Sequence, residues 1–175
     1  MQPWKLKDTL EGNPIGLSNN VTARLIPELD AHLASLFVLF HQYQKHHWLV
    51  EGPQFRDLHL FLGELYEEVH KQADMVAERI TALGGIPTSN PVDQAKIAYI
   101  THEPEGAFRI RAMLELDRSH EGQIAQKLRG TIHLTQELGD PGTEHLLKEI
   151  ILDVEDRAHH LDHFLGADSL EMGLE

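Results

Sequence analysis

The sequence predicts an all-α protein, a four-helix bundle with a long crossover that carries a short helix. In four long stretches, apolar residues recur at three- and four-residue steps, the period of a helix with one buried face. Short turns with glycine and proline separate the first stretch from the second and the third from the fourth, while the middle connection is long. We expect one domain over residues 1–175, with loosely ordered tails at 1–20 and 167–175.

The first two helices are predicted to form a hairpin. The first runs from about Val21 to Val50, and Gly52-Pro53 ends it. Pro27 lies in its first turns and is expected to delay its start. The second runs from about Phe55 to Leu83, with apolar residues at near-heptad spacing. The run Gly84-Gly85-Ile86-Pro87 is a strong stop, because glycine suits a helix end and proline cannot continue one.

The second half of the chain predicts another hairpin after a long connection. Residues from about Thr88 to Gly106 include a short apolar piece around Ile97–Ile100, and we expect this stretch to be a crossover that contains a short helix. A third long helix spans about Ala107 to Leu138 and stops at Gly139. Asp140-Pro141 supplies an N-cap and a first-turn proline for the fourth helix. Two tight turns and one long crossover are the ferritin-like arrangement of a bundle.

Composition narrows the functional classes. The net charge is −13 with neutral histidines, which argues against a surface built to bind nucleic acid. The chain has no cysteine, so thiolate metal sites are excluded, but it has 13 histidines and many carboxylates. No apolar run is long enough to cross a bilayer, and the N-terminal residues do not form a secretory signal. We therefore expect a cytoplasmic protein with no membrane partner.

One face of the second helix carries polar side chains beside the apolar stripe. At 100° per residue, an arc of about 100° contains the following residues: His59, Gly63, His70, Asp74 and Glu78. A solvated helix edge is the alternative interpretation of this stripe. Two carboxylates one turn apart repel each other, however, and a cation between them would reverse the sign of that interaction.

The same region resembles the signature of the Dps family of mini-ferritins. His47-Trp48 is followed by Gly52-x-x-Phe55-x-x-Leu58-His59, then by Asp74-x-x-Ala77-Glu78-Arg79 and Gly84-Gly85, with every spacing intact over about forty residues. The resemblance implies a homo-oligomeric shell of twelve subunits around a mineral cavity. It also implies a ferroxidase, an enzyme that oxidises Fe(II) with hydrogen peroxide or oxygen, stores the iron as ferric mineral, and protects against oxidative stress.

The resemblance assigns the site to the interface between two subunits. His47 and His59 correspond to ligands from one subunit, and Asp74 and Glu78 to ligands from its partner. Trp48 corresponds to a residue near the oxidation centre. The spacing agrees, because fifteen residues of helix put His59 and Asp74 roughly 22 Å apart within one chain. Two copies of the second helix packed antiparallel about a two-fold axis would bring them together twice per dimer.

Gly63 departs from the family pattern, in which an aspartate four residues after the second histidine helps to hold metal. His70, one turn before Asp74, could compensate, as could His163 in the cluster His159-His160-Leu161-Asp162-His163. The alternative for each is a solvated histidine. Either histidine would add a nitrogen donor to the site and so favour the binding of zinc. We therefore keep a second interpretation open, a zinc-occupied metal-binding shell with weak ferroxidase activity.

Iron must also enter such a shell. In the family, acidic residues near the start of the fourth helix line pores at three-fold axes, and the corresponding stretch holds Asp140, Glu144, Glu149 and Asp153. Rings of carboxylates attract cations by focusing negative potential. A solvated acidic face is the alternative interpretation of these four residues.

DNA binding by members of this family often depends on a lysine-rich mobile tail. Here the N-terminal segment has only Lys5 and Lys7, with Asp8 and Glu11 close by. Neutralising DNA phosphates requires a cluster of cations. We therefore expect no DNA binding.

Overall fold

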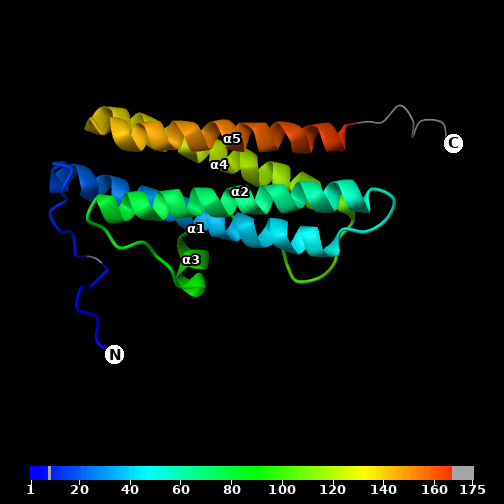
Figure 1. Cartoon of the computed structure of the whole chain (residues 1–175), viewed down its shortest axis with the longest axis horizontal. Coiled ribbons are helices and arrows are strands. Elements are labelled where there is room, and N and C mark those ends of the chain that lie inside the picture. Colours follow the sequence, from blue (N-terminus) through cyan, green and yellow to red (C-terminus); the bar gives the residue numbers. More distant parts are fainter. Residues whose placement is uncertain (8, 167–175) are drawn as a thin grey trace.

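The computed structural model describes residues 1–7 and 9–166, and these residues form five α-helices and no strand (Figure 1). The helices are α1 (Asn19–Leu49), α2 (Phe55–Ala82), α3 (Pro91–Ile97), α4 (Ile110–Leu138) and α5 (Pro141–Leu165). The four long helices lie side by side in an elongated bundle, and α3 packs on the outside against α1. The prediction of an all-α bundle with a long crossover is confirmed. The expected tail at 167–175 lies outside the described residues.

Local capping explains where two helices begin. The Ser18 side chain accepts a hydrogen bond from the backbone N–H of Val21, so α1 begins at Asn19 and Pro27 lies inside it. The expected delay at Pro27 is therefore wrong. The crossover contains the expected short helix, which begins at Pro91 because Asn90 caps it by accepting from the N–H of Val92 at 3.0 Å. Pro91 then occupies the first turn, where its missing N–H costs nothing.

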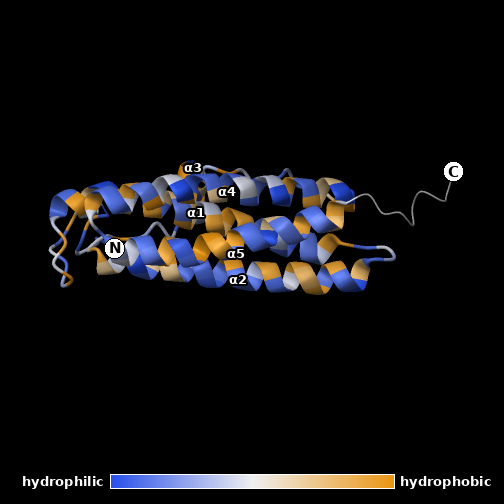
Figure 2. Ribbon diagram, turned by 90° about the horizontal axis from the view of Figure 1, so that it is seen from above, coloured by the Kyte–Doolittle hydropathy of each residue, from blue (hydrophilic) through white to orange (hydrophobic). Residues whose placement is uncertain are grey.

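The core consists of the apolar stripes that define the helices. Hydrophobic and hydrophilic residues alternate along every long helix, and the hydrophobic ones face the neighbouring helices (Figure 2). The leucines of α1 that form the stripe are fully or almost fully buried: Leu25, Leu29, Leu33, Leu36 and Leu39. Within the described residues, no helix combines the length and the apolar character needed to cross a membrane.

Buried polar residues fasten the crossover to α1. Asp30 accepts hydrogen bonds from the backbone N–H of Thr88 at 2.8 Å and from its hydroxyl at 2.5 Å. Further along, the two ring nitrogens of His32 lie 2.7 Å from the Tyr99 hydroxyl and 2.8 Å from the Thr131 hydroxyl. Burial, assisted by the charge of Lys127, lowers the pKa of His32 to about 4. His32 is therefore a neutral link between α1, the crossover and α4.

Candidate metal site on the α1–α2 face

Two histidines meet where the end of α1 passes the beginning of α2. The Nδ1 atom of His47 lies 2.6 Å from the backbone oxygen of His59, and the Nδ1 atom of His59 lies 2.8 Å from the backbone oxygen of His47. Their rings stack with centroids 3.7 Å apart. The short turn between α1 and α2 places the two residues in this reciprocal arrangement.

These hydrogen bonds determine which ring nitrogen can bind a metal. A backbone oxygen only accepts, so the Nδ1 atoms of His47 and His59 carry the hydrogens. Each Nε2 then keeps a free lone pair, and a hydrogen bond from the other ring nitrogen holds the ring in place, as in many metal sites. The arrangement is that of two oriented imidazole ligands.

Gly63 lies against this pair. A Cβ atom built at Gly63 would be 3.4 Å from both Cε1 and Nδ1 of His47, so a side chain at this position would lie directly beside the ring. The departure from the family pattern therefore removes an oxygen donor next to an imidazole. Phe55 stacks on His59 with centroids 4.9 Å apart, and Tyr66 meets His47 edge-on at 5.3 Å. These rings keep the pair only partly accessible to solvent.

The other predicted ligands follow along α2. His70 is exposed and lies against Phe40, with ring centroids 5.1 Å apart. Asp74 and Glu78 are also exposed, in the following turns of the same helix. The described part of the chain holds no group of three or more histidines and carboxylates that could bind a metal ion. Within one chain, the predicted histidine ligands thus lie near one end of α2 and the predicted carboxylate ligands near the other.

The surface beside the histidine pair is apolar. Trp48 is 65% exposed and Leu49 is 39% exposed. A large exposed tryptophan next to oriented metal ligands is typical of a surface that another subunit covers.

His163 of α5 lies beside a different face of α2 from the one that carries His59 and Gly63. It lines a pocket of about 380 Å³ together with Phe61, His160 and Phe164. Phe61 is about 200° around α2 from both His59 and Gly63, so it points away from the histidine pair. Within one chain, the structure does not bring His163 to Gly63.

The four acidic residues proposed for a pore have different surroundings. Asp140 is buried, accepts from the N–H of Thr143 at 3.0 Å and forms an ion pair with Arg79 at 2.8 Å, so it caps α5 and is not available to line a channel. Its pKa is lowered, because these hydrogen bonds and the Arg79 charge outweigh the effect of burial. Glu144 pairs with Lys148. Glu149 and Asp153 are exposed one turn apart, facing a groove toward α2.

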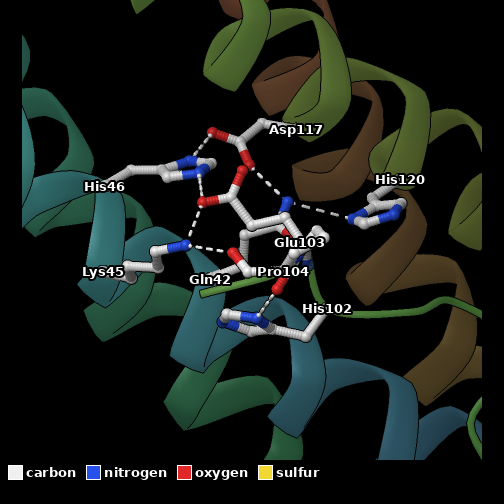
Figure 3. Close-up of polar contacts among 8 residues, drawn as sticks. All are labelled: Gln42, Lys45, His46, His102, Glu103, Pro104, Asp117 and His120. Atoms are coloured by element: carbon white, nitrogen blue, oxygen red, sulfur yellow. Dashed lines mark hydrogen bonds and ion pairs between the residues drawn. The ribbon is translucent and has the colours of Figure 1, made fainter. Parts of the chain in front are cut away.

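Sequence reasoning missed a buried polar cluster between α1, α4 and the crossover (Figure 3). Its members come from all three elements: Gln42, Lys45, His46, His102, Glu103, Pro104, Asp117 and His120. Gln42 donates to Asp117 at 2.7 Å and lies 3.1 Å from Nδ1 of His120. The available signal was that Asp117 and His120 lie in the apolar register of the third predicted helix.

His46 is the centre of this cluster and is completely buried. Its Nδ1 lies 2.7 Å from Asp117, and its Nε2 lies 3.1 Å from Glu103, which also lies 2.5 Å from the Lys45 ammonium. Burial alone would lower the pKa of His46, but the hydrogen bond to Asp117 and the charges of both carboxylates raise it. The cluster therefore balances its charges within the chain.

A second buried ion pair crosses the middle of the bundle. The guanidinium of Arg157 donates to Glu121 at 2.6 Å and to Glu68 at 2.9 Å, and the Tyr43 hydroxyl donates to Glu121 at 2.6 Å. Each residue comes from a different long helix. Burial raises the pKa of Glu121 despite the neighbouring cation. The signal for Arg157 was its place between Val154 and Leu161 in the apolar stripe.

Comparison with known proteins agrees with the fold. Residues 26–170 match the family model of the ferritin-like domain. The "DNA protection during starvation protein" of Halobacterium salinarum is 44% identical over 145 residues, which cover 83% of this chain and 80% of that protein. The "Nutrient stress-induced DNA-binding protein" of a Synechococcus species is 39% identical over 163 residues, 93% of each chain.

Solved structures give the same result. A Dps homologue from Halobacterium salinarum superimposes with a TM-score of 0.93 at 38% identity, over 97% of this chain and 95% of that one. The Dps protein of Vibrio cholerae, described as a member of the ferritin-like diiron-carboxylate superfamily, gives 0.84 at 25% identity, over 91% and 99%. The fold and the matched domain define a ferritin-like protein. The curated relatives show further that the chain belongs to the Dps family.

Proposed function

We propose that this protein is an iron-oxidising and iron-storing mini-ferritin whose ferroxidase site forms between two subunits. His47 and His59 of one subunit and Asp74 and Glu78 of its partner bind Fe(II) as the substrate. Two ferrous ions supply the two electrons that reduce one hydrogen peroxide to two hydroxides; oxygen is the alternative acceptor. The ferric product is deposited in a hollow shell of about twelve chains, which removes both reactants of oxidative damage.

The observation that carries this proposal is the reciprocal pair of His47 and His59. Both rings are oriented by backbone hydrogen bonds and keep a free Nε2, yet among the described residues they belong to no group of three or more histidines and carboxylates that could hold a metal ion. Asp74 and Glu78 share the exposed face of α2 with His59, and a two-fold axis across this face would supply them. Carboxylates suit the product as well, because they stabilise the higher charge of ferric iron.

The other residues have supporting roles in this proposal. Trp48, exposed in one chain, packs beside the oxidation centre at the dimer interface. Glu144, Glu149 and Asp153 remain proposed pore residues at a three-fold axis, and Asp140 is dropped because it is buried as a helix cap. The proposed location is the cytoplasm, and the proposed partners are copies of the same chain and metal ions.

The direct test replaces both carboxylates of the half-site. Asp74→Ala with Glu78→Ala should abolish ferrous oxidation, measured by the absorbance of the ferric product, while light scattering shows an unchanged shell. The matched control replaces two exposed glutamates of α4, Glu115 and Glu137, and removes the same charge. Native oxidation by the first variant would place the site elsewhere, and an isolated monomer or dimer of the unmodified chain would refute the shell.

A second candidate function rests on Gly63. This position contributes no oxygen next to the His47 ring, and His70 lies on the same face of α2, so the assembled site would be rich in nitrogen. Divalent affinities rise from iron to zinc, and nitrogen donors strengthen that order. Zinc held at this site would inhibit iron oxidation, leaving a metal-binding shell with weak activity. In that case His70→Ala should lower the zinc affinity and relieve the inhibition, and an unchanged zinc affinity would exclude His70 as a ligand.

A further inference from the structure

A second group of metal-binding side chains lies near the end of α5, away from the proposed ferroxidase site. Asp156, His159, His160 and His163 fall within an arc of about 100° on this helix, and all four are exposed. His160 and His163 line a pocket with Phe61, which points away from the face of α2 that holds His59. The proposed oxidation of iron therefore leaves this histidine group without a role.

Two of these histidines are spaced for chelation. The ring centroids of His159 and His163 are 4.3 Å apart, with the rings nearly perpendicular at 85°. Two imidazoles that share a metal at bond lengths of about 2.0–2.1 Å and angles of roughly 90–109° have centroids about 4.5–5 Å apart. A small rotation of each ring would therefore direct one nitrogen of each toward a common metal.

The contacts of the neighbouring side chains indicate which of them are available to bind a metal. Asp162 forms an ion pair with Arg118 of α4, so it is already committed within the chain. His160 turns its ring toward Phe61, and its Nδ1 lies 3.7 Å from Asp156, which is too long for a hydrogen bond. Phe61 and Phe164 line the same pocket as His163, so one side of the pair is bordered by aromatic rings.

We propose that His159 and His163 form a second metal site, a two-histidine clamp for a divalent ion of the zinc or copper class. Imidazole nitrogen favours these ions over magnesium, calcium or manganese, which prefer oxygen. No three histidine or carboxylate side chains converge in the described part of the chain, so two positions of the metal remain for water or a neighbouring subunit. The clamp is independent of the ferroxidase proposal.

Zinc titration of the assembled protein tests the clamp. A background with His47→Ala, His59→Ala, Asp74→Ala and Glu78→Ala removes the four proposed interface ligands, and zinc is titrated against a chromophoric chelator. We expect His159→Ala and His163→Ala each to weaken the remaining zinc binding by at least about tenfold, as loss of a ligand exceeds loss of an outer partner. His133→Ala, which removes an exposed histidine of α4, should change nothing.

Copper gives an independent readout on the same background. The electron paramagnetic resonance spectrum of one bound Cu(II) per chain should show two nitrogen donors, and only one after His163→Ala. Unchanged zinc affinity in both clamp variants would overturn the proposal. It would also be overturned if His133→Ala weakened zinc binding as much as they do, since binding would then be distributed over surface histidines. Circular dichroism checks that each variant keeps its helices.

Discussion

His46 and His47 are neighbours in the chain but belong to opposite kinds of environment. His46 is completely buried and lies between Asp117 and Glu103, with its charge balanced inside the molecule. His47 is partly exposed, and its Nδ1 is held by a backbone oxygen, which leaves the lone pair on Nε2 for a metal. A rotation of 100° along α1 separates the two roles. Residue type alone therefore does not identify a ligand; a free and oriented lone pair does.

The largest expected effect comes from replacing each of these two histidines by alanine in turn. His46→Ala removes the imidazole that lies between the buried carboxylates of Asp117 and Glu103 and leaves them with only Gln42 and Lys45 as partners. We expect it to lower the free energy of unfolding by about 3–5 kcal/mol. His47→Ala opens no buried charge and should cost about 1 kcal/mol while weakening metal binding at the interface. Urea unfolding and ferrous titration of the two variants measure both quantities. If the two variants lost similar stability, the contrast between the buried, paired His46 and the partly exposed His47 would be wrong.

His32, another buried histidine, should make the free energy of unfolding depend on pH. Its pKa is about 4 in the folded chain and near 6.5 when unfolded, so the unfolded state binds the proton first as the pH falls. Its contribution is constant above pH 6.5 and is lost progressively between pH 6.5 and 4, by about 3 kcal/mol in total.

A matched pair of variants isolates this effect. His32→Gln keeps a polar side chain between Tyr99 and Thr131 but cannot titrate, so stability should fall less steeply over this pH range. His133→Gln removes an exposed histidine and should keep the full slope. Equal slopes in both variants would show that His32 does not cause the acid sensitivity.

Gly63→Asp sharpens the open side of the comparison, because it should restore the missing oxygen next to His47. The change in stability should stay within about 0.5 kcal/mol, since aspartate and glycine are both poor helix formers. Anaerobic ferrous titration should show additional binding at each site, with a shift of preference from zinc toward iron. Gly63→Asn, of the same size but neutral, is the control and should give a smaller gain. No difference between the two would indicate that position 63 does not contact the metal.

The smallest effect is expected with DNA, although two relatives carry names that refer to DNA. Both lysines of the N-terminal segment already form ion pairs within the chain: Lys5 pairs with Glu11 at 3.1 Å, and Lys7 pairs with Asp30 at 2.8 Å. With a net charge of −13, no free cluster of cations remains in this segment to neutralise phosphates. We expect no retardation of linear DNA in a gel at low salt, before or after replacing both lysines by alanine. Retardation that depends on the lysines would refute this expectation.

The sequence predicted the bundle well, because helix periodicity and glycine–proline stops are local signals. It predicted that the crossover contains a short helix but not its bounds, which depend on the cap at Asn90. The pairing of His47 with His59 follows from the motif, but the reciprocal hydrogen bonds depend on the shape of the turn. Periodicity could not reveal that Asp117 and Arg157 have buried partners, because those partners come from distant segments. The geometry of a site shared by two subunits cannot be derived from the sequence of one chain alone.

Arg157 has a consequence for when the protein becomes active. Ferritin-like proteins with dinuclear metal centres build them from carboxylates that project into the bundle. Here a permanent cation from α5 lies in the interior, with Glu68 and Glu121 as its counterions. In the proposed function, metal chemistry would therefore take place at the surface, at a site that is complete only after two chains meet. A newly made chain would then be chemically silent, and reactive iron would be handled only where a compartment is ready to receive it.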